Sequence, residues 1–384
     1  TKVRNRRRGK AVNINSRKSI NEERAKYNKG DVFEFVISAA MVARFTDRYD
    51  DGTAMPLTAQ SVEDVMAQYF AGNRQWEVDE GDDQVDVVLF DTAALPGAAL
   101  VQLNTPGYRG SKEVQDMVKS SITAVKRGTI GDLADDVISN NRPDNVVIRP
   151  VGTLAQSATK SDVDVYVNGT EVRRAGISLK YETKKETQIA QFSGRDSVQS
   201  LRSAFATFGI EVKPALKVVE KAVSQLGGVY TGRDDPLIQK DKAIMFPAVR
   251  SVFDFVSKKF SGNWLANVRN AATLADGFIK AGRGQEEDVE IIKGSGSKSI
   301  TFNRATFEAL KRGLATSAKN KAIIWRIGQE GGNPKIILVA DGLEVFSIRF
   351  RYDADSNKDK TQYRVRFRTY VQTGKELPAF IEKY

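Results

Sequence analysis

The stretch SDVDVYVNGTEVRRAGISLKYE (Ser161–Glu182) predicts two β-strands joined by a tight turn. Valine alternates with polar residues in its first half, which is typical of a strand with one buried face. Asn168-Gly169 favours the positive backbone angles of a two-residue hairpin turn. We therefore expect one strand over residues 162–167 and a second over residues 175–181, paired as a hairpin.

The polar side chains of these two strands are expected to lie near one another. Period-2 alternation gathers them on one face of each strand, and the set is Asp162, Asp164, Ser178, Lys180 and Glu182. Because an unpaired ammonium inside a protein is strongly unfavourable, Lys180 must face solvent, pair with a carboxylate or line a site. Two carboxylates can hold Mg²⁺, and a nearby lysine can stabilise or deprotonate the attacking water in phosphodiester hydrolysis. From spacing alone, a cross-strand ion pair on an exposed face stays the alternative.

The chain of 384 residues contains neither cysteine nor histidine. Disulfides, thiolate or imidazole metal sites and histidine-dependent triads are therefore excluded, and catalysis must rest on carboxylate, lysine, serine or tyrosine groups. No apolar run approaches the roughly 20 residues that span a bilayer, and no signal peptide is recognisable. We expect no membrane partner and an intracellular, cytoplasmic location.

Most of the net charge of +11 lies in residues 1–29, which hold 11 Lys or Arg and two Glu. Blocks of like charge are typical of disordered arms that contact polyanions, so this arm is expected to bind DNA phosphates. The candidate contacts are the cations of RNRRRGK, namely Arg6, Arg7, Arg8 and Lys10. A solubilising tail or an arm that packs on another subunit remains open.

A helix is expected from Asp31 to about Phe45, because its apolar residues recur at helical spacing. Glu34 lies in its first turns, where the helix dipole favours an acid whatever its function. The run AALVQLN, near residue 100, is expected to be a strand.

The pattern as a whole predicts a mixed α/β protein with four segments. These are the basic arm, a core over 30–210 with an α/β insertion at about 50–140, a helical region over 211–290, and an α+β region over 291–384. Alternating helices and strands favour an α/β class, and runs of strands after runs of helices favour an α+β region.

Two stretches, GDVFEFVISAAMVARF and KSDVDVYVNGTEVRRAGISLK, resemble the PD-(D/E)xK, or restriction-endonuclease-like, nucleases. In that pattern a helix often carries a metal-site Glu, an Asp opens one strand, and (D/E)-x-K follows on the next. The resemblance implies a restriction-endonuclease-like mixed β-sheet core flanked by helices, with the insertion and the C-terminal region added to it. Ser178 stands where the pattern has an acid, which gives S-x-K.

The resemblance also implies roles for individual residues. The metal ligands are oxygen donors of the helix and the two strands: Glu34, Asp162 or Asp164, the carbonyl of Leu179, and Glu182 in place of the missing acid. Lys180 is the motif lysine that positions or activates water. A glutamine of QIAQFSG lies near the site, with Gln188 and Gln191 as the candidates.

The function implied is that of a Mg²⁺-dependent (or Mn²⁺-dependent) DNA nuclease, an endonuclease of phage or restriction type. A phage-encoded protein of this kind works in the host cytoplasm. The alternative is a catalytically inactive DNA-binding or virion-associated structural protein that keeps the fold, and Ser178 is the feature that favours it. A homo-oligomer is open as a further partner.

Two arginine-rich strands near the end of the chain predict a β-ribbon with one basic and one apolar face. Their cations alternate with apolar residues and are Arg349, Arg351, Arg364, Arg366 and Arg368. Such a ribbon can enter a major groove or follow phosphates. The alternative is a solvated face neutralised by Asp353 and Asp355.

Overall fold

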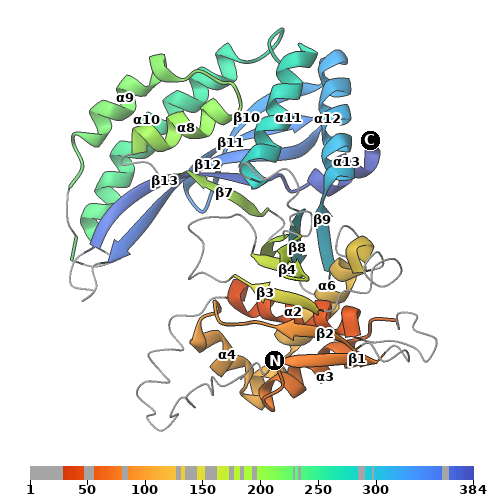
Figure 1. Ribbon diagram of the computed structural model, residues 1–384. Coiled ribbons are helices and arrows are strands. Elements are labelled where there is room, and N and C mark those ends of the chain that lie inside the picture. The colour runs from red at the N-terminus through yellow and green to blue at the C-terminus, as the bar shows by residue number, and fades with distance from the viewer. Residues whose placement is uncertain are drawn as a thin grey trace.

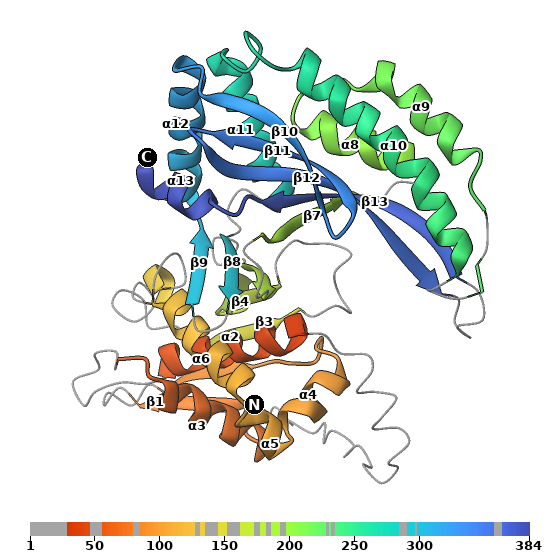
Figure 2. The same cartoon turned by 180° about the vertical axis from the view of Figure 1, so that it is seen from behind.

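The structure, a computed structural model, describes residues 29–46, 56–79, 85–126, 131–134, 145–151, 162–172, 177–181, 186–192, 197–227, 230–231, 235–283, 290–295, 298–356 and 363–384. Within them the protein is a mixed α/β molecule with two β-sheets, each with its own helices and its own hydrophobic core. Figure 1 shows the first sheet in the lower half of the molecule and the second in the upper half, and Figure 2 shows the same division from behind. The predicted α/β class is confirmed.

The first sheet is mixed and has the strand order β1-β2-β3-β4-β6-β8-β9, with β5 paired to β4. The pairs β2/β3 and β6/β8 are parallel and the other pairs are antiparallel. The strands are β1 (Gln75–Asp79), β2 (Val85–Phe90), β3 (Asn145–Pro150), β4 (Val163–Val167), β5 (Thr170–Glu171), β6 (Ile177–Tyr181), β8 (Glu290–Ser295) and β9 (Lys298–Phe302).

The helices that accompany this sheet include α2 (Lys29–Thr46), α3 (Ala59–Phe70), α4 (Gly97–Leu103), α5 (Pro106–Arg109) and α6 (Lys112–Val125). The predicted first helix is confirmed as α2, and every side chain from Asp31 to Ala43 in it is buried. A helix that is apolar on all sides must be enclosed, and α2 is covered by α3, α6 and strands β2, β3 and β6. Its Phe35 packs on Phe90 of β2 with ring centroids 5.1 Å apart.

The second sheet is antiparallel throughout, with the order β10-β11-β12-β13-β7. Its strands are β7 (Gln188–Phe192), β10 (Ile323–Glu330), β11 (Asn333–Ala340), β12 (Leu343–Ser356) and β13 (Tyr363–Thr373). Its helices are α8 (Ser197–Thr207), α9 (Lys213–Val223), α10 (Pro236–Lys259), α11 (Val268–Arg283), α12 (Arg304–Lys319) and α13 (Leu377–Lys383). The long ribbon β12/β13 reaches past the other strands, beside α10 (Figure 1).

The two cores divide the chain differently from the predicted segments. Strands β1 and β2, expected in an insertion, pair within the first sheet, and α3 and α6 pack on α2. Residues 188–281 share a core with the C-terminal strands, whereas β8 and β9 return to the first sheet. The expected boundaries near 210 and 290 are therefore wrong, because strand pairing between distant segments decides which core a segment joins.

The run AALVQLN is helix α4 and not the strand that was expected. Its apolar residues Ala98, Ala99 and Leu103 are buried, while residues 100–102 are only partly buried. That spacing matches one side of a helix, and short apolar runs do not by themselves distinguish a buried strand from a helix. Among the described helices, none combines the length and apolar character that crossing a bilayer requires.

Candidate active site at a fork between strands

Among the described residues, strands β4 and β6 pair antiparallel through Val163 and Ile177, beside Asp162, which precedes β4. Val163 pairs with Ile177, and the Asn168-Gly169 turn leads into the short strand β5 instead of directly into β6. Asn168 and Gly169 have φ of 49° and 77°, as predicted for a two-residue turn. β4 thus pairs antiparallel with β5 and with β6, as a hairpin requires, and the place where the start of β4 meets β6, around Asp162 and Ile177, is called the fork below.

Asp162 lies in this fork. Its backbone carbonyl accepts a hydrogen bond from the N–H of Val151, at 2.9 Å, and its own N–H donates to the carbonyl of Ile177. These two bonds fix the residue between the end of β3 and the start of β6. Its side chain is only 10% exposed.

The Asp162 carboxylate collects three donors from β6 on one oxygen, Oδ2. The N–H of Leu179 donates to it, the hydroxyl of Ser178 donates at 3.4 Å, and the ammonium of Lys180 lies 3.5 Å away. The same ammonium donates to the carbonyl of Leu179 at 2.9 Å. The structure therefore brings together four of the predicted residues, and the carboxylate bonded to Lys180 is that of Asp162.

Lys180 lies on the side of the sheet away from α2. Ile177 and Leu179 belong to the core that contains α2, so the alternate residues Ser178 and Lys180 belong to the opposite face. Glu34 is buried at 4% exposure on α2 and approaches the sheet from the core side. The expectation that Glu34 and Lys180 meet at one point is not supported, because α2 packs on the face of β6 opposite to the one that carries Lys180.

Among the described residues, no three acidic side chains form a group placed to hold a metal ion. Glu34, Asp162 and Asp164 are all described, so the predicted trio does not assemble in this structure. Asp164 follows on β4, where its register partner is Arg149 of β3. Glu182 lies outside the described residues, as do Arg6, Arg7, Arg8 and Lys10 of the arm.

The predicted glutamines belong to the other sheet. Gln188 and Gln191 lie on β7, which pairs with β13, and their register partners are Gln372 and Tyr370. The expectation that they border the site is corrected, because the chain leaves the first sheet after Tyr181 and joins the second sheet.

The predicted basic ribbon exists as β12/β13, but its cations differ in their environment. Arg349 is 9% exposed and forms a 2.7 Å ion pair with Glu330, so the prediction that it contacts DNA is wrong. Arg351 is exposed, and its register partner Arg368 is half-buried. Two cations directly opposite each other disfavour the strand pair unless an anion joins them.

Arg364 and Arg366 lie on β13 with side chains outside the described set. Their register partners are Asp355 and Asp353. This register matches the alternative in which acids neutralise the outer part of the ribbon.

The face of the first sheet opposite α2, called the open face below, carries polar residues that were not predicted from the sequence. Arg149 donates from Nε to the Asp91 carboxylate at 2.9 Å, and its guanidinium carbon lies 4.9 Å from the centroid of the Tyr166 ring. Arg149 alternates with buried residues in NVVIRP and stands opposite Asp164 in the sheet. That alternation is the signal in the sequence from which Arg149 could have been selected.

Tyr181 ends β6 on the core side, where its ring lies 5.1 Å from that of Phe33. Burial raises the pKa of its phenol, and the carboxylates of Glu113 and Asp116 raise it further. The phenol therefore keeps its proton at neutral pH and is unsuited to act as a base.

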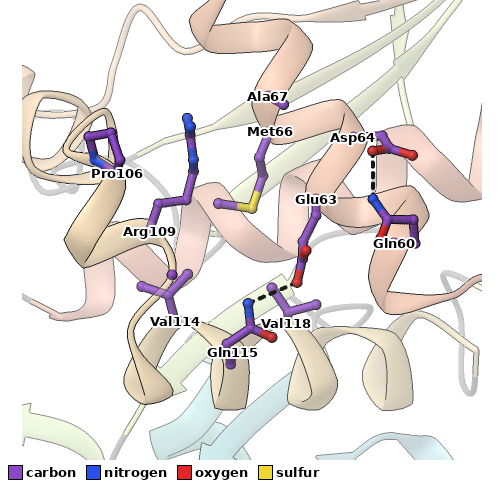
Figure 3. A pocket seen from close by; sticks show the side chains of 11 residues that line it. Gln60, Glu63, Asp64, Met66, Ala67, Pro106, Arg109, Val114, Gln115 and Val118 are labelled. Atoms are coloured by element: carbon purple, nitrogen blue, oxygen red, sulfur yellow. Dashed lines mark hydrogen bonds between the residues drawn. The ribbon is translucent and has the colours of Figure 1, made fainter.

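A cavity of about 300 Å³ lies between α3, α5 and α6, on the helical side of the first sheet (Figure 3). Its floor includes Met66 and Val118, and its polar lining includes Glu63, Asp64 and Arg109. Both carboxylates accept 2.8 Å hydrogen bonds from glutamine side chains. None of the predicted site residues lines it, and two acids beside one guanidinium do not favour a phosphate.

The chain matches no protein-family model, no curated protein sequence and no solved structure. The fork between β4 and β6 therefore rests on its own geometry as the candidate site.

Proposed function

We propose that the protein is a divalent-metal-dependent DNA nuclease whose reaction centre is the fork between β4 and β6. The observation that carries this proposal is the convergence of an acid, a lysine and a backbone carbonyl on one point. Asp162, Lys180 and Leu179 are joined there by hydrogen bonds, as the resemblance to PD-(D/E)xK nucleases implies.

The oxygen atoms at the fork suit a hard cation. They are the carboxylate of Asp162, the carbonyl of Leu179 and the hydroxyl of Ser178, and oxygen ligands of this kind are preferred by Mg²⁺ and Mn²⁺. When bound, such an ion supplies charge neutralisation at the phosphate and lowers the pKa of a water ligand. Asp162 and the Leu179 carbonyl would hold it, and the substrate and water would complete its shell.

Lys180 is suited to hold the nucleophile or the phosphate. Its side chain is 30% exposed, so the ammonium reaches solvent while its stem crosses the sheet surface. An ammonium near a phosphodiester stabilises the charge that develops on the phosphate oxygens. The same ammonium orients an attacking water by donating a hydrogen bond to it.

DNA contact is proposed for the exposed end of the basic ribbon and for the N-terminal arm. Arg351 is exposed and stands opposite Arg368 on the neighbouring strand, and adjacent cations of this kind suit contact with DNA phosphates. The net charge of +11 favours approach to a polyanion.

The second candidate is a DNA-binding or virion-associated protein that keeps this arrangement without hydrolysis. Two observations favour it: Ser178 replaces the motif acid, and no group of three acids is found among the described residues. Such a protein binds DNA with the salt dependence of phosphate contacts and shows no turnover.

The test is cleavage of supercoiled and linear DNA in Mg²⁺ or Mn²⁺ by the wild type and by Lys180→Ala. Lys311→Ala is the matched control, because Lys311 lies on α12 beside the second sheet. Its side chain is 38% exposed and pairs with Asp276 at 3.0 Å. Cutting by the wild type and by Lys311→Ala, with loss of about a hundredfold or more in Lys180→Ala, supports the nuclease. DNA binding without any cleavage by the wild type selects the second candidate.

A further inference from the structure

Arg149 and Tyr166 form a stacked pair on the open face of the first sheet. Arg149 stands on β3 and Tyr166 on β4, and the guanidinium lies over the ring at 4.9 Å from its centroid. The 2.9 Å bond from Arg149 Nε to Asp91 fixes the plane of the guanidinium. The side chain of Arg149 is 41% exposed, and Tyr166 is half-buried beside it, so the guanidinium reaches solvent.

This pair shares its face with Lys180. In β3 and β4 the buried residues Ile148 and Val165 point to the core that holds α2, which places Arg149 and Tyr166 on the opposite side. Lys180 is on that side too, on β6. Only β4 separates β3 from β6 in the sheet order, which corresponds to about 10 Å across the sheet. The registers of Arg149 with Asp164 and of Val163 with Ile177 also displace Lys180 by roughly 13 Å along the strands, so a base at Arg149 and a phosphate at Lys180 belong to different nucleotides of one strand.

We propose that Arg149 and Tyr166 form a subsite that stacks an unpaired base of the DNA strand whose phosphate lies at Lys180. The proposal rests on the nuclease function and specifies its substrate as DNA with a single-stranded segment, such as an overhang or a frayed end. Aromatic rings and guanidinium planes are the surfaces on which proteins stack unpaired bases. The exposed guanidinium plane offers a surface on which a base extends the existing stack.

The surrounding charges favour a base over a phosphate at this position. Asp91 is bonded to Arg149, and Asp164 is the register partner of Arg149. Two carboxylates so close to one guanidinium leave no excess positive charge, and a phosphate there would meet repulsion. A neutral base is free of that repulsion, and its amino groups can donate to a carboxylate.

Duplex DNA does not satisfy such a subsite. Each paired base has both faces covered by its neighbours, and exposing one requires unpairing and unstacking. The structure therefore predicts a preference for single-stranded over blunt duplex DNA that depends on the ring of Tyr166 and the plane of Arg149.

The test is fluorescence anisotropy in EDTA with a labelled single-stranded oligonucleotide and the blunt duplex of the same sequence. Tyr166→Leu removes the ring, Tyr166→Phe keeps it, and Arg149→Lys keeps the charge without the plane. Arg326→Lys is the matched control, because Arg326 is 52% exposed and paired with Glu344 on the second sheet. Circular dichroism establishes that each variant is folded.

We expect Tyr166→Leu and Arg149→Lys to lose at least about fivefold in affinity for the single strand, while Tyr166→Phe and Arg326→Lys bind as the wild type does. Affinity for the duplex should stay unchanged in all four. Unchanged single-strand affinity in Arg149→Lys and in a folded Tyr166→Leu overturns the subsite. If Tyr166→Leu does not fold, Arg149→Lys alone decides.

Cleavage by the wild type separates failure of the subsite from failure of the nuclease. A protein that cuts DNA but whose binding ignores both substitutions retains the proposed function and loses the subsite. A protein that binds single strands through Arg149 and Tyr166 but never cuts retains the subsite and loses the nuclease. Absence of any DNA binding by the wild type overturns both.

Discussion

A buried ion pair connects the chain that leaves the candidate site to the second sheet. Lys335 of β11 and Glu186 lie 2.6 Å apart from Nζ to Oε1, with side chains 4% and 8% exposed. Thr187, the next residue, exchanges two 2.8 Å hydrogen bonds with Thr373 of β13. The pair and these bonds fix residues 186–187 against the second sheet, directly before β7.

Breaking this pair should be far more harmful than replacing it. Removing one partner leaves a buried, uncompensated charge and typically costs about 3–5 kcal/mol, whereas exchanging both partners for apolar residues of similar size is often neutral. Because both side chains are less than a tenth exposed, the Lys335→Met variant should lose about 3–5 kcal/mol of unfolding free energy. The double variant Lys335→Met, Glu186→Leu should recover most of that loss.

The assay is urea unfolding of the wild type, both single variants and the double variant, followed by tryptophan fluorescence. The double-mutant cycle isolates the coupling between the two side chains, provided that the slope of free energy against urea stays constant. A loss below about 1 kcal/mol in Lys335→Met, the range of exposed ion pairs, would show that the pair is not buried. Equal destabilisation of Lys335→Met and the double variant would refute the reasoning in the same way.

Two further predictions concern stability. Burial raises the pKa of Asp241, and a hydrogen bond from the N–H of Gly227 opposes part of that shift. Between the ordinary pKa and the raised pKa, the folded state therefore binds more protons than the unfolded state. The contribution of Asp241 to stability therefore falls as pH rises through that interval. Urea unfolding at several pH values should show the free energy of unfolding of Asp241→Asn rising relative to that of the wild type there. A difference between the two that does not change with pH contradicts this. A Cβ at Gly294 of β8 would lie 2.7 Å from Phe33 of α2 and 2.9 Å from Tyr181 of β6. Gly294→Ala should accordingly cost about 1–3 kcal/mol through overpacking, and unchanged unfolding would show that this layer is loosely packed.

Short-range patterns were enough to predict the elements of the fold. Alternation identified the strands β12 and β13, and helical spacing identified α2, because these periods depend only on which side of an element is buried. The strand prediction for AALVQLN was wrong because a run of seven residues is too short for the strand and helix periods to be told apart. The two-core division was not predictable, since it depends on β7 pairing with β13, far along the chain.

In the candidate site, too, contacts between residues near in sequence were predictable, and contacts between distant segments were not. Asp162 and Lys180 lie close in sequence, on either side of one turn, so their contact was predictable. The position of Glu34 relative to them depends on which side of the sheet α2 covers, and the pairing of Arg349 with Glu330 depends on the β10–β11 turn. Both relations arise from tertiary packing, which local periodicity does not contain.

The central claim is that the fork at Asp162 binds a divalent metal ion. The most direct measurement is a titration of Mn²⁺ followed by electron paramagnetic resonance, with the wild type, Asp162→Asn and Asp164→Asn, each with and without a DNA oligonucleotide. The fork predicts that Asp162→Asn weakens Mn²⁺ binding by at least about tenfold, while Asp164→Asn binds Mn²⁺ as the wild type does. Unweakened binding in Asp162→Asn, or no binding by the wild type even with DNA present, would contradict the claim.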